Sequence, residues 1–241
     1  MRLIILTTQT LHHAYFVRKL ANRFPLSAVF IESDVLPPPY ETAHSFELER
    51  DNYEKETWFG GEEPCIDKIA ECRNFLSLDS SVAVSAMKDM RADLGIVFGT
   101  RRLRGEAMKV CPTLLNLHGG DPELYRGLDT HLWAIWHRDF SSLVTCLHHI
   151  APRLDTGNIV SKAPVRLRQG MKLSQLRAAN TETCLELTCR AAAAYEADGA
   201  VDSIPQRVEG RYYSFMPVAL KTVCLDVFER YCRGLTESGN S

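Results

Sequence analysis

The sequence lacks the cysteine spacing of metal-binding and disulfide-rich proteins. None of its eight cysteines stands in a C-x-x-C pair, and they are scattered through apolar segments. In a chain of this length, such cysteines indicate neither a zinc site nor a disulfide framework. They are typical of buried, reduced thiols and favour a cytoplasmic location. The histidine pairs have no convincing third ligand, so we expect no metal site.

The sequence also lacks a membrane segment and a strongly basic region. No apolar run approaches the roughly 20 residues that a helix needs to span a bilayer, and the N-terminal run M-R-L-I-I-L is too short for a secretion signal. Lysine and arginine total 28, aspartate and glutamate total 30, and no basic stripe is long enough to follow a nucleic-acid backbone. We therefore expect neither a membrane nor a nucleic acid as partner.

The residues that are present predict one α/β domain. With 241 residues, 45% of them hydrophobic, the chain can bury one sizeable core. An apolar run at 2–6 is typical of a strand buried on both faces, the apolar residues of 11–24 follow helical spacing, and 27–31 is a second strand candidate. This β-α-β order predicts a parallel sheet with a right-handed crossover.

The rest of the chain continues the alternation, without an internal repeat or a flexible linker. A P-P-P break and a charged stretch mark residues 35–63 as a surface insertion, with a helix at 41–58. Further strands are predicted at 75–78, 94–98, 113–117, 142–150 and 159–165. Further helices are predicted at 64–73, 80–90, 105–110, 128–136, 171–197 and 216–233. The fold class is therefore α/β, with a Rossmann-like, mostly parallel sheet flanked by helices over residues 1–166 and a helical C-terminal extension, 167–241, packed on the same domain.

One predicted strand ends in two polar side chains that can do chemistry. The strand at 113–117 delivers Asn116 and His118 at its carboxyl end, where open α/β sheets bind their ligands. A turn that contains Asp155 lies between the two following strands. Each of these residues alone could be a strand end or a turn former, but their order and spacing together predict an active site.

Three motifs in this order resemble those of the folate-dependent formyltransferases. They are Asn116-Leu117-His118, Tyr125-Arg126-Gly127 and the run from Leu154 to Ile159, in which Asp155 lies 39 residues after Asn116 (155 − 116). The resemblance is specific over residues 94–160. The family includes glycinamide ribonucleotide, methionyl-tRNA and amino-sugar N-formyltransferases, and the layout is closest to the last group.

The resemblance implies a formyl transfer from 10-formyltetrahydrofolate to an amine, without a metal. An amide N–H suits the developing oxyanion, and such donors lower barriers by roughly 3–4 kcal/mol. Asn116 would therefore polarise the formyl oxygen and His118 would assist the developing charge. Asp155 would orient His118 and manage the proton. Because the acceptor must be neutral and His118 must hold the right proton, we expect the rate to titrate near neutrality.

The resemblance also assigns the walls of the site. One wall of the pterin pocket would comprise Phe98, Gly99, Thr100 and Arg101, and the other would comprise Leu154, Thr156 and Gly157. The acceptor side would comprise His12, His13, Tyr125 and Arg126. We expect His148 and His149 to be strand residues that face opposite sides of the sheet, and Arg101, Arg102 and Arg104 to form a solvated basic loop rather than an anion contact.

Departures from the family patterns narrow the acceptor. The loop T-T-Q-T-L-H-H after the first strand has no glycine for a phosphate cradle, which disfavours glycinamide ribonucleotide. Only about 75 near-neutral residues follow Pro164, which disfavours tRNA. Formyltetrahydrofolate hydrolases carry a regulatory domain ahead of this one, and we expect none because the predicted domain starts at Met1. A small-molecule amine remains, and a nucleotide-linked amino sugar is the first choice.

Several alternatives stay open. The chain could formylate an amino acid or hydroxylamine in secondary metabolism, hydrolyse formyltetrahydrofolate, or bind folate without catalysis. The aromatic residues of the insertion, Tyr40, Phe46, Tyr53, Trp58 and Phe59, could stack on a base, but we expect them to pin the insertion to the core. The apolar helix at 216–233 suits a homodimer contact and packing on its own sheet equally well.

Overall fold

The computed structural model describes residues 1–34 and 36–236 and confirms the predicted α/β fold. A seven-stranded sheet has the order β3-β2-β1-β4-β5-β7-β8, parallel from β3 to β5, with β7 and β8 added antiparallel. The strands are β1 (Leu3–Thr7), β2 (Leu26–Glu32), β3 (Cys72–Phe75), β4 (Leu94–Phe98), β5 (Thr113–His118), β6 (Tyr125–Gly127), β7 (Val144–His149), β8 (Ile159–Pro164) and β9 (Arg211–Tyr213). The α-helices are α1 (Leu11–Ala21), α2 (Ser45–Phe59), α3 (Ser81–Asp89), α4 (Thr130–Trp136), α5 (Leu176–Asp198) and α6 (Val218–Arg233).

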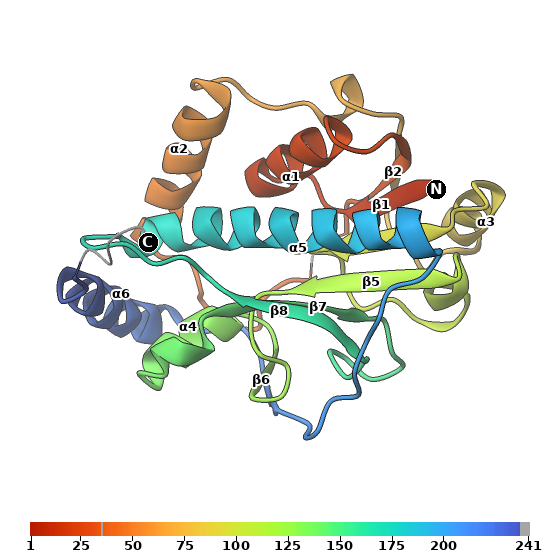
Figure 1. The fold of residues 1–241 in the computed structure, drawn as a ribbon. Coiled ribbons are helices and arrows are strands. Elements are labelled where there is room, and N and C mark those ends of the chain that lie inside the picture. The colour runs from red at the N-terminus through yellow and green to blue at the C-terminus, as the bar shows by residue number, and fades with distance from the viewer. Residues whose placement is uncertain (35, 237–241) are drawn as a thin grey trace.

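Helices cover both faces of the sheet, because successive residues of the central strands are apolar and point to opposite faces in turn. On β1, Leu3 and Ile5 pack with Phe16 of α1 and with α5, whereas Ile4 and Leu6 pack with Met87 of α3. Figure 1 shows α5 running between α1 and the strands β7 and β8. No helix among the described residues is long and apolar enough to cross a membrane.

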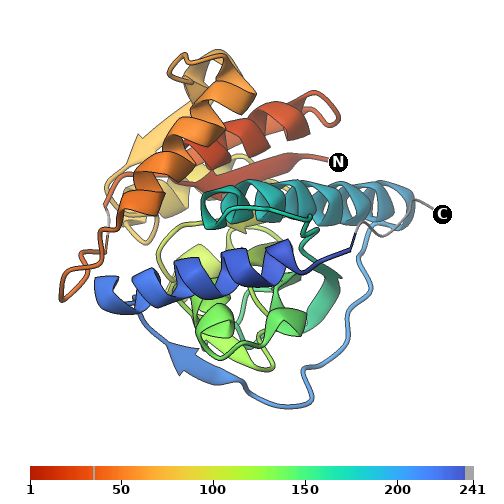
Figure 2. The same cartoon turned by 90° about the vertical axis from the view of Figure 1, so that its left-hand side faces the viewer.

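A third apolar cluster joins the C-terminal helix to the rest of the molecule. Helix α6 buries Cys224, Phe228 and Cys232 against residues of α4 and of the segment before α5, and Figure 2 shows α6 beside α4 and α5. The helix therefore packs within its own chain, but chiefly on α4 and the segment before α5 rather than on the sheet, the packing that the sequence suggested beside a dimer contact. Val223 lies on the outer side of the helix and is exposed.

The predicted surface insertion contains α2, which is docked firmly. Trp58 stacks on Tyr15 of α1 with ring centroids 4.0 Å apart, and Phe46 is only 4% exposed. These aromatic side chains pin the insertion to the core, as expected, whereas Tyr40 stays exposed and donates its hydroxyl hydrogen to the carbonyl of Phe215. Residue 35 of the predicted insertion and residues 237–241 of the predicted extension lie outside the described residues.

Two stretches differ from the sequence-based prediction. The expected helix at 64–73 is only a 3-10 turn, η1 (Ile66–Lys68), and the next strand is β3 at Cys72–Phe75 rather than 75–78. The strand forms at residues 72–75 because these residues pair with the open edge of β2, and such tertiary contacts override weak local preferences.

The C-terminal extension is also not helical throughout. Residues 199–217, which we call the return segment, run extended from α5 to α6 around the lower edge of the molecule in Figure 1 and contain β9. Gly199, in the left-handed conformation, ends α5. The other 3-10 turns are η2 (Gly105–Lys109), η3 (Phe140–Ser142) and η4 (Leu173–Gln175).

Candidate active site

Two paired strands place the central side chains of the site. Asn116 and His118 lie two residues apart on β5 and therefore share a face of the sheet. Strand β7 runs antiparallel beside them, and its register sets His148 directly opposite Asn116. His148 is 2% exposed, whereas its neighbour His149 is half-buried, so the two histidines face opposite sides of the sheet, as predicted.

Asp155 reaches these side chains from the turn between β7 and β8. Its Oδ2 lies 3.6 Å from Nδ1 of His118, and its Oδ1 lies 3.6 Å from Nε2 of His148. The backbone N–H of Gly127 donates to Oδ2 at 2.9 Å. The backbone of Asp155 is left-handed, with φ of 56°, a conformation that non-glycine residues adopt only where their surroundings hold it.

His148 is the member of the site that the sequence did not single out. Its Nδ1–H donates to the carbonyl of His149 at 2.8 Å, which leaves Nε2 to accept from the Asn116 amide at 3.2 Å. The side chains thus form a series from Asn116 through His148 and Asp155 to His118. The pairing of β7 with β5 would have revealed His148, but an antiparallel register is not visible in one sequence.

The hydrogen bonds assign one tautomer to His118. Its Nε2–H donates to the carbonyl of Tyr125 at 2.8 Å, so Nδ1 is the nitrogen that can gain or lose a proton, and it faces Asp155. One hydrogen of the Asn116 amide is used on His148, and the second is available to another acceptor. The arrangement can therefore donate a neutral hydrogen bond and exchange a proton within one small region.

The surroundings keep Asp155 ionised although it is buried. Burial alone would raise the pKa of this carboxyl, which is 5% exposed. The imidazoles of His118 and His148, when they carry a second proton, act in the other direction together with the Gly127 N–H, and the pKa of Asp155 is lowered from 3.8 to about 2. Asp155 is consequently a carboxylate at any physiological pH.

The predicted first wall, residues 98–101, is a loop held from beneath by a buried carboxylate. Glu32, at the end of β2, accepts from the backbone N–H of Arg101 at 2.7 Å and from that of Leu78 at 3.2 Å. The Arg101 side chain pairs with Asp34 at 2.7 Å, and the Thr100 hydroxyl donates to the carbonyl of Arg101 at 2.9 Å. The loop geometry is therefore fixed mainly through its backbone.

His13 closes the other side of this loop. Its Nδ1 lies 2.9 Å from the hydroxyl oxygens of both Thr8 and Thr10, and its ring packs edge-on against Phe98 with centroids 4.5 Å apart. A Cβ on Gly99, whose φ is +78°, would lie 2.3 Å from the His13 ring, so only glycine fits there. His12 stands beside His13, with ring centroids 3.9 Å apart.

The predicted second wall, residues 154–157, is bound tightly to the strands and to the return segment. A Cβ on Gly157 would lie 1.7 Å from the carbonyl oxygen of His149, which allows no side chain. The Thr156 hydroxyl donates to the carbonyl of Arg153 at 2.9 Å, and the carbonyl of Leu154 accepts from Arg126 at 3.1 Å. Arg102 donates to the carbonyl of Pro152 and thereby joins the two walls.

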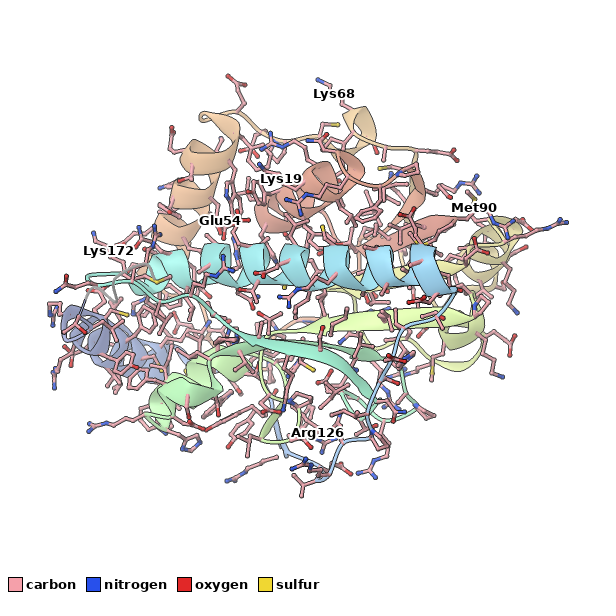
Figure 3. The ribbon with its side chains drawn as sticks, in the orientation of Figure 1. Lys19, Glu54, Lys68, Met90, Arg126 and Lys172 are labelled. Carbon is pink, nitrogen blue, oxygen red and sulfur yellow. The ribbon has the colours of Figure 1, made fainter. Side chains whose placement is uncertain are left out.

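Tyr125 and Arg126 are occupied by contacts within the protein. The Tyr125 hydroxyl donates to Asp139 at 3.1 Å, while its carbonyl holds His118. Arg126, labelled in Figure 3, donates to the carbonyl of Gly210 at 2.6 Å and pairs with Glu209 at 2.6 Å. Both residues thus connect the site with the return segment, Tyr125 through the pairing of β6 with β9 and Arg126 through Glu209 and Gly210. The sequence offered no signal for this connection.

One depression of the surface lies away from this site. An open depression of about 650 Å³ lies at the amino ends of β1, β4 and β5, the opposite end of the strands, and is lined by residues that include Arg2, Asp93 and Lys109. Among residues 1–34 and 36–236 there is no group of three or more His, Cys, Asp and Glu side chains that could hold a metal ion.

Solved structures of formyltransferases share this fold. A sugar N-formyltransferase from Shewanella matches with a TM-score of 0.60 and 11% identity over 100% of this chain and 83% of that chain. A 4-N formyltransferase from Francisella tularensis matches with a TM-score of 0.58 and 14% identity over 88% of this chain and 76% of that chain. At such identities the likeness establishes the fold.

One structural neighbour was solved with ligands. The formyltransferase PseJ from Anoxybacillus kamchatkensis, in complex with UDP-4,6-dideoxy-4-formamido-L-AltNAc and tetrahydrofolate, matches with a TM-score of 0.53 and 16% identity over 99% of this chain and 93% of that chain. No protein-family model and no curated protein sequence matches this chain.

Proposed function

We propose that this protein is an N-formyltransferase that moves a formyl group from 10-formyltetrahydrofolate to the amine of a nucleotide-linked amino sugar. The observation that carries the proposal is the convergence of an amide, two imidazoles and a carboxylate at the carboxyl end of β5, with Asp155 within 3.6 Å of both His118 and His148. The fold shared with sugar N-formyltransferases supports the same activity.

The residues fit a folate donor. Two walls, Phe98–Arg101 and Leu154–Gly157, would flank the site. Hydrogen bonds to the N–H of Arg101 and to the carbonyls of Leu154 and Gly157 fix the course of the two loops, so that their other backbone groups keep set positions for a flat pterin ring. They would hold the pterin, and the bound donor would supply the formyl group. The two walls are joined by Arg102 and the carbonyl of Pro152, so that they would hold their spacing while the donor binds.

Asn116 would stabilise the charge that develops on the formyl oxygen. Its amide gives one hydrogen to His148, and this bond orients the second hydrogen without consuming it. A pre-oriented neutral donor of this kind lowers a barrier by roughly 3–4 kcal/mol. His148, held in turn by the carbonyl of His149 at 2.8 Å, would act on the reaction through Asn116 and Asp155.

His118 and Asp155 would handle the proton of the attacking amine. The amine must attack as the neutral species, and the proton that it then releases would pass to Nδ1 of His118. From there the proton would pass to the donor nitrogen as its bond to the formyl carbon breaks and tetrahydrofolate leaves, which returns His118 to its starting state. The carboxylate of Asp155, 3.6 Å away, would stabilise the charged ring. Because Asp155 stays ionised far below neutrality, the pH dependence of the rate would arise from the amine and the imidazole.

The acceptor side would be formed by His12 and His13 at the start of α1 and by the loop around Tyr125 and Arg126. A small-molecule amine is the partner in this proposal, and PseJ, a neighbour of the same fold, has a UDP-linked formamido sugar bound.

The proposal extends to location and assembly. The eight cysteines are all free thiols, which supports a cytoplasmic location. A homodimer remains part of the proposal, and the exposed side of α6 around Val223 would be its contact.

A coupled assay tests the proposal. The purified protein is mixed with 10-formyltetrahydrofolate and a panel of nucleotide-linked 4-amino sugars, release of tetrahydrofolate is followed by absorbance, and the acceptor is weighed by mass spectrometry. We expect tetrahydrofolate release that depends on one acceptor and a matching gain of one formyl group on it. The Asn116→Ala variant should keep its fold and lose at least about a hundredfold in kcat.

Other outcomes would replace the proposal. Tetrahydrofolate release at an equal rate without any amine would make the protein a hydrolase. Tight folate binding without release, with every amine tested, would make it a binding protein. Turnover with an amino acid or a hydroxylamine, but with no amino sugar, would move it to secondary metabolism.

A further inference from the structure

The return segment brings one side chain from residues 199–217 to the turn that carries Asp155. The neighbours Pro205 and Arg207 are exposed, whereas the side chain of Gln206 turns inward and is half-buried. Its Nε2 donates to the carbonyl of Asp155 at 2.8 Å and to the carbonyl of Gly157 at 2.9 Å. Only the NH₂ end of the amide can serve two carbonyls, so the contacts fix the orientation of the amide.

These two hydrogen bonds act on a strained position. Asp155 is a non-glycine residue in the left-handed region, at φ of 56°, and such a strained conformation persists only where neighbouring groups hold it. Gly157 is packed against the His149 carbonyl on one side, and Gln206 bonds to it on the other. The amide thus clamps the turn on both sides of Thr156.

The return segment is itself anchored on both sides of Gln206 along the chain. Before Gln206, Ile204 and Ile159 exchange two backbone hydrogen bonds, at 2.8 and 2.9 Å. After it, the N–H of Arg207 donates to Glu123 at 2.7 Å, and the N–H of Gly210 donates to the carbonyl of Pro122 at 3.1 Å. Gln206 is therefore held by a segment that is fixed to the sheet and to the loop after β5.

We propose that Gln206 is a positioning residue that holds the turn at Asp155 so that the carboxylate faces His118 and His148. The positioning is a property of this fold, and its consequence for catalysis rests on the proposed formyl transfer. The backbone N–H of Gly127 reports on the position directly, because it donates to Oδ2 of Asp155 at 2.9 Å. When the turn moves, this amide loses its acceptor.

The test compares Gln206→Met, which keeps the length of the side chain and removes both N–H donors, with Val208→Ala, an exposed control on the same segment. We expect Gln206→Met to lower kcat at least tenfold, with the KM for the formyl donor within about twofold of wild type. The hydrogen exchange of the Gly127 amide should speed up about tenfold. Amides of β1 and β4 should exchange as in wild type, and Val208→Ala should match wild type in every measurement.

Two readouts separate this inference from the proposed function. If the wild-type protein shows no formyl transfer, the proposed function fails, and exchange at Gly127 still decides whether Gln206 holds the turn. If the wild-type protein is active, the inference is overturned when Gln206→Met keeps either the kcat of the wild-type protein or its hydrogen-exchange rate at the Gly127 amide. Faster exchange throughout β1 and β4 overturns it as well, because Gln206 would then stabilise the whole fold rather than the turn.

Discussion

At the scale of single residues, the site depends on which histidine of a pair faces it. His148 accepts from Asn116 and lies 3.6 Å from Asp155, whereas the side chain of His149 points to the other side of the sheet. The sequence H-H gives no reason to prefer either, and only the strand register distinguishes them. The sequence alone therefore does not reveal that His148, rather than His149, contacts Asn116 and Asp155.

The pair His148→Ala and His149→Ala tests the role of His148. Removal of His148 frees the Asn116 amide and takes one partner from Asp155, so we expect kcat to fall by about one to two orders of magnitude. His149→Ala keeps the backbone carbonyl that His148 uses and should stay within about threefold of wild type. Steady-state kinetics on both variants provide the measurement. Equal kinetics for the two variants would remove His148 from the site.

At the scale of elements, the loop after β4 depends on a carboxylate from β2. Glu32, at the end of β2, joins the segments that follow β3 and β4 through the N–H groups of Leu78 and Arg101, and it is almost fully buried. Asp34, two residues further on, pairs only with the side chain of Arg101 in an exposed position. Both carboxylates contact the same arginine, but only one contacts its backbone.

We predict that Glu32→Gln raises the KM for the formyl donor at least about tenfold. The two oxygens of Glu32 each accept from one N–H, of Leu78 and of Arg101, whereas the amide of Gln keeps only one oxygen and turns an NH₂ group toward the other N–H. Asp34→Asn should change this KM less than about twofold, since exposed ion pairs contribute little. The KM values are measured with a saturating acceptor. Equal effects of the two substitutions would show that loop position does not depend on Glu32.

The docking of α2 provides a second test at this scale. Glu54, labelled in Figure 3, is 0% exposed and accepts from Nε and Nη2 of Arg177 on α5 at 2.7 and 2.6 Å. Glu54→Ala leaves this guanidinium without its bidentate partner, and we expect a loss of about 3 kcal/mol in the free energy of unfolding. The exposed Glu49→Ala on the same helix should change it by less than about 0.5 kcal/mol. Urea denaturation measures both, and similar midpoints would contradict the buried pair.

The elements that the sequence predicted correctly are those with strong periodic patterns. The apolar runs of β1, β4 and β5 and the helical spacing of α1 set the order and the layers of the domain, because burial of both faces of a strand leaves an unbroken apolar run. Asn116, His118 and Asp155 were predictable for a different reason, namely the order and spacing of their motifs. The approach of Asp155 to His118 is observed at 3.6 Å.

The features that the sequence did not predict are those fixed by pairing between distant segments. β3 forms because the edge of β2 is open, and β9 forms because residues 211–213 meet β6, which lies more than eighty residues earlier. Glu32, His148 and Gln206 all act through such pairings. None of them stands in a local pattern, so one sequence contains no signal for their partners.

At the scale of the whole molecule, buried titratable groups make stability depend on pH. Burial, followed by the charge of Arg177, lowers the pKa of His13 from 6.5 to about 3, and the ring is 4% exposed. His13 is therefore neutral in the folded protein at a pH where the unfolded chain would protonate it. Asp155 behaves in parallel at lower pH, since its pKa falls from 3.8 to about 2 on folding.

The sign of both effects is the same, because in each case the unfolded state binds the proton first as the pH falls. The free energy of unfolding should therefore decrease below pH 6.5 on account of His13, by about 1 kcal/mol at pH 5.5 and by more down to about pH 3. His131, whose pKa burial lowers to about 4, adds to the decrease in the same direction, and Asp155 adds a further decrease between about pH 4 and pH 2. Denaturant titrations at pH 7.5, 5.5, 4 and 2.5 follow both steps. His13→Gln should lessen the decrease between pH 7.5 and 5.5 by about 1 kcal/mol and the decrease between pH 5.5 and 4 by about 2 kcal/mol, whereas Asp155→Asn should change the profile only below about pH 4. If His13→Gln keeps the wild-type slope above pH 5.5, the imidazole is already charged in the folded protein, and its burial against Phe98 and Gly99 cannot be as described.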